Sequence, residues 1–222
     1  MLSESNVEEF VSRYVSNGNV IAIGSGTHSE SFLKKLAFLV QEKEWKVKVV
    51  PCSASLGILC ADFHLPMTSL NDSEVDVGFE FADLVDEMYN YVKRDSTSLI
   101  RDKMIAQSAD ELIIIAEKKN WVPQLKGVTP VEISAFGWKR TITQLQNFGK
   151  AKLREMKGSP FKTESGHFLA DVEMDEVFVP EELDGELKKI PGVIETGFFI
   201  GYADRVILHN KGIEVKSRLL NP

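Results

Sequence analysis

Charged side chains of both signs gather in one stretch of the chain, between positions 80 and 103. They are Glu80, Asp83, Asp86, Glu87, Lys93, Arg94, Asp95, Arg101, Asp102 and Lys103. Carboxylates that converge beside a lysine shift one another's pKa values, and acid–base catalysis depends on such shifts. Taken alone, the composition of the stretch favours a solvated charged loop. It therefore becomes a candidate catalytic site only together with other features of the sequence.

A glycine-rich turn is the second feature that could do chemistry. It reads Gly24-Ser25-Gly26-Thr27-His28-Ser29. The turn lies between a predicted strand and a predicted helix, where backbone N–H groups and the positive end of the helix dipole can hold an anion. Phosphate binding is the favoured interpretation, and a purely structural turn is the main alternative. Dinucleotide binding fits poorly, because the third glycine is absent and no acidic residue ends the next strand, at 50–52.

The first half of the chain alternates strand and helix patterns, which predicts an α/β fold with a parallel sheet covered by helices. Apolar runs predict strands at 20–23, 45–50, 75–79 and 111–116. Helical spacing of apolar residues predicts helices at 7–15, 32–40, 53–62 and 98–108. Glu80 and Asp83 follow the strand at 75–79, at the carboxyl edge where open α/β sheets bind their ligands.

The second half changes to short strands and two helices, which predicts a smaller α+β domain. Strands are expected at 131–133, 152–156, 167–173, 193–200, 205–208 and 213–217. Helices are expected at 138–146 and 180–189. We place a boundary near 127–130, so that residues 1–129 plus 202–222 form one domain and residues 130–201 the other.

Composition and charge limit the class of protein. The 222 residues are 43% hydrophobic and 27% charged, which excludes a disordered or fibrous chain. The formal net charge of -7 argues against nucleic acid as a partner. The longest apolar runs, such as 112–116, are far shorter than the roughly 20 residues of a membrane span. The first residues lack the basic region and apolar core of a signal peptide, so we expect a cytoplasmic protein without membrane contact.

Few side chains are available for disulfides or metal ions. Cys52 and Cys60 are too few for a disulfide framework or a zinc site, and we expect both to be small buried side chains. The histidines are His28, His64, His167 and His209. Their spacing is not that of metal ligands, so we expect each to lie at the surface or in a hydrogen bond, and we expect no metal.

Five stretches of the sequence resemble the motifs of one family. The turn at 24–28 resembles Gly-Thr-Gly-Ser-Thr, and residues 75–103 align without a gap on a strand followed by Asp-Gly-Ala-Asp-Glu, Lys-Gly-Gly-Gly and Arg-Glu-Lys. Residues 130–133 resemble Pro-Val-Glu-Val, and residues 163–167 resemble Thr-Asp-Asn-Gly-Asn. Most specific is 190–199, which is nearly Ile-Pro-Gly-Val-x-x-Thr-Gly-Leu-Phe. Over almost its entire length, the sequence therefore resembles ribose-5-phosphate isomerase, type A.

The resemblance implies a Rossmann-like parallel-sheet domain with a smaller α+β domain, assembled as a homodimer or homotetramer. It implies reversible conversion of ribose 5-phosphate into ribulose 5-phosphate through an enediolate, a step of the pentose phosphate pathway, without a cofactor. The matching catalytic residues are Asp102 as the base, Glu80 and Asp83 for ring opening and hydroxyl binding, and Lys93 to stabilise negative charge. The matching residues for the small phosphosugar are Gly24, Ser25, Gly26, Thr27, His28, Arg94, Asp95, Ser96 and one of Lys118 and Lys119.

The candidate site also departs from the family pattern. Arg94, Asp95 and Ser96 stand where the family has three glycines, which restricts the backbone and adds bulk. Glu80 is one methylene longer than the matching aspartate and Asp102 one shorter than the matching glutamate, and the two changes can compensate across one pocket. Two alternatives follow from these departures. One is a relative without catalysis that binds a sugar phosphate or another protein, and the other is an isomerase of a different phosphosugar.

Overall fold

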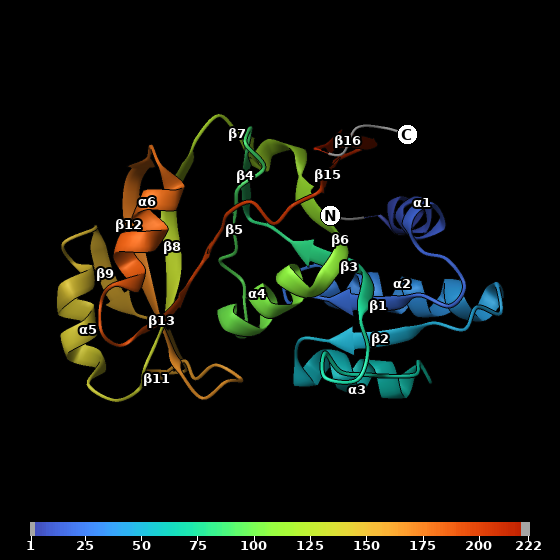
Figure 1. Cartoon of the computed structure of the whole chain (residues 1–222), viewed down its shortest axis with the longest axis horizontal. Helices are drawn as coiled ribbons and strands as arrows, with labels where there is room; N and C mark the ends of the chain where they lie inside the picture. Colours follow the sequence, from blue (N-terminus) through green and yellow to red (C-terminus); the bar gives the residue numbers. More distant parts are fainter. Residues whose placement is uncertain (1–2, 219–222) are drawn as a thin grey trace.

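The larger part of the molecule is built on one mostly parallel sheet (Figure 1). The computed structural model describes residues 3–218, apart from the side chain of residue 176. The strands of this sheet are β1 (Val20–Ile23), β2 (Lys48–Pro51), β3 (Val75–Phe81), β6 (Ala109–Glu117), β15 (Arg205–His209) and β16 (Ile213–Ser217). Within the described residues their order is β16-β15-β6-β3-β1-β2, and every neighbouring pair is parallel except β15 with β16. The predicted α/β fold is confirmed.

Helices cover the faces of this sheet. They are α1 (Glu4–Tyr14), α2 (Ser29–Glu42), α3 (Ala54–Asp62) and α4 (Leu99–Ser108). Ser53 begins α3 by accepting a hydrogen bond from the N–H of Leu56 at 3.3 Å. Neighbouring residues of β6 face opposite sides, because Ile113 packs in the core that contains α1 and α2, whereas Ile114 packs in the core that contains the start of α4. Burial on both faces explains why these strands are continuous apolar runs.

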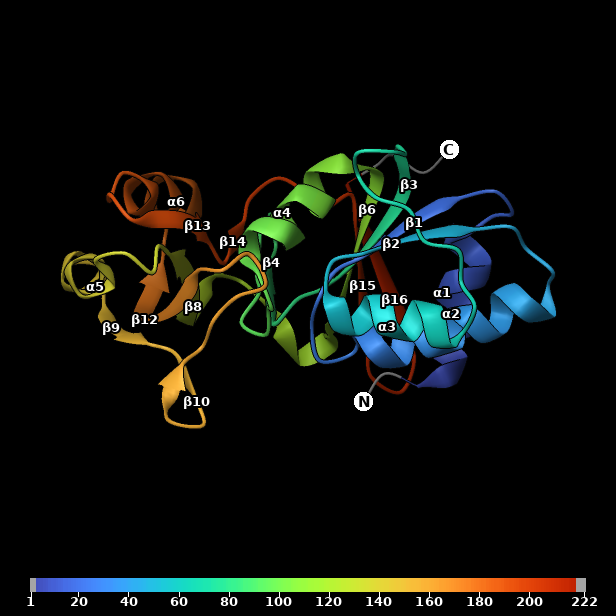
Figure 2. The same ribbon diagram turned by 90° about the horizontal axis from the view of Figure 1, so that it is seen from below.

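The smaller part of the molecule, on the left in Figure 1, is an antiparallel sheet with two helices. Its strands are β8 (Leu125–Ile133), β9 (Lys150–Leu153), β12 (Phe168–Val177) and β13 (Val193–Thr196), in the order β13-β8-β12-β9. The helices α5 (Trp138–Leu145) and α6 (Pro180–Lys188) bury Leu145 and Leu187 in the same core as Val131 of β8. A hairpin of β10 (Glu155–Met156) and β11 (Ser159–Pro160) projects from this sheet (Figure 2). The predicted α+β region is confirmed.

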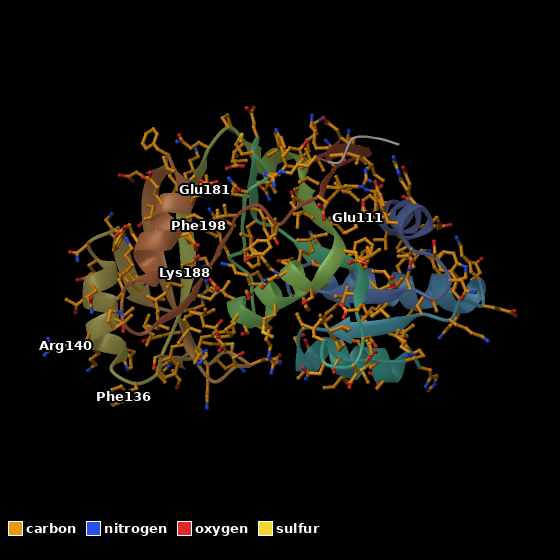
Figure 3. All side chains as sticks on the ribbon, in the orientation of Figure 1. Glu111, Phe136, Arg140, Glu181, Lys188 and Phe198 are labelled. Carbon is orange, nitrogen blue, oxygen red and sulfur yellow. The ribbon has the colours of Figure 1, made fainter. Side chains whose placement is uncertain are left out.

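Four very short strands lie between the two parts. They are β4 (Leu84–Asp86), β5 (Tyr91–Val92), β7 (Trp121–Val122) and β14 (Phe198–Phe199), in the order β14-β5-β4-β7. Phe198 is buried, and Figure 3 shows it between α6 and the middle of the molecule. The strand β14 follows the smaller part in the sequence and pairs with β5. Next to this pair, the backbone N–H of Lys93 donates to the backbone oxygen of Gly197, so this pairing fixes the position of Lys93.

Three expectations from the sequence concern the chain as a whole. The strand β8 runs without a break through position 129–130, so the division of the chain at that point stays a prediction. Cys52 and Cys60 are buried and unpaired, as expected. Among residues 3–218, the structure has no helix that is long and apolar enough to cross a membrane.

Candidate active site

The centre of the site is an ion cluster made of Glu80, Lys93 and Asp102. The ammonium of Lys93 pairs with Oε2 of Glu80 and lies 2.9 Å from Oδ2 of Asp102, and all three side chains are fully buried. Glu80 comes from β3, Lys93 follows β5, and Asp102 lies in the first turn of α4. The interpretation of the charged stretch as a solvated loop is therefore wrong for these three residues.

Asp102 also connects the glycine turn (residues 24–28) with the 94–96 loop (Arg94, Asp95 and Ser96). Its Oδ1 accepts a hydrogen bond from the backbone N–H of Ser25 at 2.9 Å. Its Oδ2 accepts from the hydroxyls of Ser25 at 2.6 Å and Ser96 at 2.7 Å. The position in the first turn of α4 places this carboxylate at the positive end of the helix dipole. The carboxylate is thus held in one orientation from three sides.

Glu80 holds a proton more tightly than an ordinary glutamate. Burial raises its pKa to about 8, although Lys93 pulls it down. Burial alone would lower the pKa of Lys93, but Asp102 and Glu80 outweigh it and raise this pKa. Oε1 of Glu80 is buried without a hydrogen-bond partner among the described residues. At neutral pH the cluster therefore contains a charged Lys93 and a largely protonated Glu80 that can donate a proton.

Gly24 makes room for Glu80. A Cβ atom at Gly24 would lie 2.1 Å from Oε2 of Glu80, a distance that no side chain tolerates. Gly26 is required for a different reason, because its φ of +145° is a conformation that L side chains rarely adopt. The two glycines thus let the turn pass directly over the buried ion cluster.

A small cavity of about 130 Å³ opens beside the glycine turn. Its walls include Gly26, Thr27, His28, Asp83, Asp95 and Glu117. The hydroxyl of Thr27 donates a hydrogen bond of 2.8 Å to Oδ2 of Asp95 at the exposed side of this turn cavity. Glu80, Lys93 and Asp102 are not among the described lining residues, so they lie behind the turn rather than in the open cavity.

The 94–96 loop is tied to Asp83 and to the smaller part of the molecule. Oδ2 of Asp83 accepts the backbone N–H groups of Arg94 at 2.5 Å and Asp95 at 3.3 Å. The guanidinium of Arg94 donates to the backbone oxygens of Val128 at 2.8 Å and Lys126 at 2.9 Å. These bonds give the loop a fixed path although it contains none of the family's three glycines.

Lys118 and Lys119 are not among the lining residues of the turn cavity. They lie in a short 3-10 helix, Lys118–Asn120, and pair with Glu214 and Glu117, each at 2.7 Å. The side chain of this segment that does line the cavity is Asn120, together with Glu117. Sequence reasoning missed both, although Glu117 ends β6 and Asn120 follows it closely, at the carboxyl edge of the sheet, which is the same signal that singled out Glu80.

A second buried carboxylate, Glu132 of β8, binds the start of α4 from the smaller part. Its oxygens accept from the N–H of Ile100 at 3.0 Å and from the hydroxyl of Thr163 at 2.7 Å. His167 contacts the same carboxylate through Nδ1 at 3.0 Å. Glu132 thereby fixes the position of the helix that carries Asp102. The sequence placed Glu132 in the motif at 130–133 but did not indicate this role.

The histidines follow the prediction except for one. His167 is hydrogen-bonded and His64 is exposed, as expected. His209 is 1% exposed, and neither of its ring nitrogens has a partner among the described residues, so the expectation was wrong for it. Its ring packs edge-on against His28 at 5.6 Å, and burial lowers its pKa to about 4. His209 ends β15, which lies between β6 and β16 in the sheet, and its side chain has almost no access to water.

A larger cavity of about 610 Å³ lies on another side of α4. Cys52, Met67, Ile100, Arg101, Met104 and His167 are among its lining residues. None of the candidate site residues lines it, and its walls are mostly apolar. No group of three or more His, Cys, Asp or Glu side chains in the described part of the chain has the geometry of a metal site.

Known proteins resemble this chain in sequence and in structure. The sequence model of the family described as ribose 5-phosphate isomerase A (phosphoriboisomerase A) matches residues 48–212. "Ribose-5-phosphate isomerase A 2" of Oceanobacillus iheyensis is 34% identical over 90% of this chain and 91% of its own. Ribose-5-phosphate isomerase A of Bacillus mycoides is 32% identical over 91% and 93%. A solved D-ribose-5-phosphate isomerase in complex with phospho-erythronic acid superimposes with a TM-score of 0.91 at 30% identity, covering 97% of both chains. The enzyme of Methanocaldococcus jannaschii gives 0.87 at 26% identity, over 97% of this chain and 98% of its own.

Proposed function

The chain belongs to the ribose 5-phosphate isomerase A family, and on this premise we propose that its own residues interconvert D-ribose 5-phosphate and D-ribulose 5-phosphate through an enediolate. The observation that carries the proposal is the buried cluster of Glu80, Lys93 and Asp102 directly behind the glycine turn. Such a reaction moves a proton between C2 and C1, and it needs a base and groups that stabilise an oxyanion. In the cluster, the lysine contacts both acidic side chains, Glu80 and Asp102.

Asp102 is the base in this proposal, and because its side chain is buried behind the glycine turn, binding of the sugar must open a path to it. Its Oδ1 accepts one described hydrogen bond, from the Ser25 N–H, and therefore keeps lone-pair capacity for a proton from the sugar. Its Oδ2 is held by Lys93, Ser25 and Ser96, so the carboxylate is already oriented before substrate arrives. Orientation of this kind is a large part of catalytic rate, since misplacement by about 1 Å can cost about 100-fold.

Lys93 and Glu80 act on the oxygens of the sugar. Lys93 carries the positive charge that a developing enediolate oxygen requires, and burial strengthens its field. Glu80, with its raised pKa, supplies the proton that opens the furanose ring. Asp83 lines the turn cavity and is the carboxylate for the sugar hydroxyls.

The 5-phosphate binds at the glycine turn. The turn lies at the amino end of α2, where backbone N–H groups and the helix dipole attract an anion. Thr27 adds a hydroxyl and His28 a ring N–H at the wall of the same cavity. Ribose should therefore bind much more weakly than ribose 5-phosphate. Equal affinities of the two sugars by calorimetry would contradict the proposal that this turn binds the phosphate.

A coupled assay that follows ribulose 5-phosphate tests the whole assignment. Asp102→Asn should lower kcat by about 100-fold or more without loss of the fold, because the amide cannot take the proton. Asp110→Asn is the matched control, since Asp110 is exposed and outside the site. A wild-type chain that binds ribose 5-phosphate and does not convert it would contradict the proposal and favour a relative that has lost catalysis.

The proposal includes a homo-oligomer that acts in the cytoplasm. Large apolar side chains remain exposed on the smaller part of the molecule, among them Phe136 and Phe178, and Figure 3 shows Phe136 at its outer end beside Arg140. Exposed apolar groups of this size favour a contact with another protein surface. Unpaired Cys52 and Cys60 suit a reducing compartment. Sedimentation analysis of the purified chain measures the oligomer.

A further inference from the structure

The glycine turn, where we place the phosphate, already binds an acidic side chain of the protein itself. The Thr27 hydroxyl donates its hydrogen bond to the carboxylate of Asp95, at 2.8 Å. Both side chains are exposed and line the turn cavity, so a ligand that enters meets this pair first. Asp95 therefore accepts the hydrogen bond that a phosphate oxygen would accept.

The contact is not a chance position of a floppy side chain, because the backbone on both sides of Asp95 is held. Asp83 accepts the N–H of Asp95 and of its neighbour Arg94, and Arg94 is bound to the backbone of β8. On the other side, Ser96 donates to the buried carboxylate of Asp102. The loop thus presents Asp95 to the glycine turn from a fixed base, and Thr27 is the described hydrogen-bond partner of its exposed side chain.

The size and charge of the turn cavity lead to the same conclusion. At about 130 Å³ it is smaller than the roughly 300 Å³ at which ordinary ligand pockets begin. Asp83, Asp95 and Glu117 give its walls three carboxylates, of which Glu117 is already paired with Lys119 at 2.7 Å. A phosphate at this turn gains room and loses a repelling charge only if Asp95 moves.

We propose that Asp95 is an internal competitor for the phosphate group and that it sets the affinity of this site for phosphorylated ligands. Phosphate binding requires the Thr27–Asp95 contact to break, after which Thr27 donates to the ligand and the mouth of the turn cavity widens. This inference rests on the proposed place of the 5-phosphate. It goes beyond that proposal because it assigns a specificity-determining role to a residue of the loop.

Titration calorimetry with inorganic phosphate tests the competition without any need for turnover. Asp95→Ala removes both the charge and the acceptor, and should tighten phosphate binding by about tenfold or more. Asp95→Asn keeps an acceptor for Thr27 and should give an intermediate gain. The matched control is Glu117→Gln, measured in a Lys119→Met background. It removes one charge from the same cavity, leaves the Thr27–Asp95 contact in place and does not release the ammonium that pairs with Glu117.

The outcomes separate the possibilities. Unchanged or weaker phosphate binding by Asp95→Ala overturns the proposal, and so does an equal gain from Glu117→Gln, which would reduce the effect to net charge. Ribose is the second probe, and its affinity should not change in Asp95→Ala, since it carries no phosphate. If Asp95→Ala binds phosphate more tightly while the wild type lacks isomerase activity, the proposed reaction fails and the competition stands. If the wild type isomerises and Asp95→Ala leaves phosphate affinity unchanged, only the competition fails.

Discussion

Replacement of Glu80 by glutamine tests the protonation of the buried ion cluster. Glu80 has a pKa of about 8 in the folded protein against an ordinary value of 4.5, mainly because burial disfavours its charge. The folded state therefore keeps a proton that the unfolded chain releases. The stability that this group contributes is fully present below pH 4.5 and is lost as the pH rises towards 8. Glutamine does not titrate, so Glu80→Gln should lack this loss.

The magnitude follows from the two pKa values. Between about pH 5.5 and about pH 7.5 the wild type binds close to one proton more when folded, and one proton is worth about 1.4 kcal/mol per pH unit. The free energy of unfolding of Glu80→Gln, relative to wild type, should therefore rise by roughly 2–3 kcal/mol over this interval. The side-chain carbonyl oxygen of the introduced glutamine can still accept from Lys93, so the contact itself survives the change.

Urea unfolding at a series of pH values measures this difference. Wild type and Glu80→Gln are compared with Glu9→Gln, which changes an exposed carboxylate on α1 and should run parallel to wild type. Parallel curves for wild type and Glu80→Gln would refute the reasoning. They would mean that Glu80 stays charged throughout and forms a full ion pair with Lys93.

Three further changes test the same site. Lys93→Met leaves two buried acids without their cation, and should lower the free energy of unfolding measured in urea by about 3–5 kcal/mol. It should also lower kcat by about 100-fold, and an unchanged kcat would mean that Lys93 has a structural role alone. Gly24→Ala places a Cβ 2.1 Å from Glu80 and should lower both the melting temperature and kcat, whereas wild-type values would mean that the turn is free to move. Glu80→Asp and Asp102→Glu should each lower kcat, and the double change should do better than the product of the two effects, because both carboxylates meet one ammonium. Strictly additive effects in steady-state kinetics would contradict this compensation.

The order of the main elements could be predicted because each leaves its own periodic signal. The strand β1 was predicted with the bounds that the structure has, and the helix α4 within one residue. The strands β4, β5, β7 and β14 have two or three residues each, too few for any periodicity, and three of them were not predicted at all. Of these, β5 matters most, since the pairing of β5 with β14 places Lys93.

The site was divided in the same way between sequence and tertiary structure. The sequence by itself determined the residue types, their place at the carboxyl edge of the sheet and the family motifs, because these depend on neighbours along the chain. Only the tertiary structure decided that Lys93 is buried between two acids and that the Thr27 hydroxyl donates to Asp95. It also decided that Asn120 rather than a lysine lines the turn cavity. The Thr27–Asp95 bond joins residues 68 positions apart. The burial of a side chain and its hydrogen-bond partners depend on how segments distant in the sequence pack together. Packing therefore determines pKa shifts and side-chain orientations that cannot be predicted from a local sequence pattern.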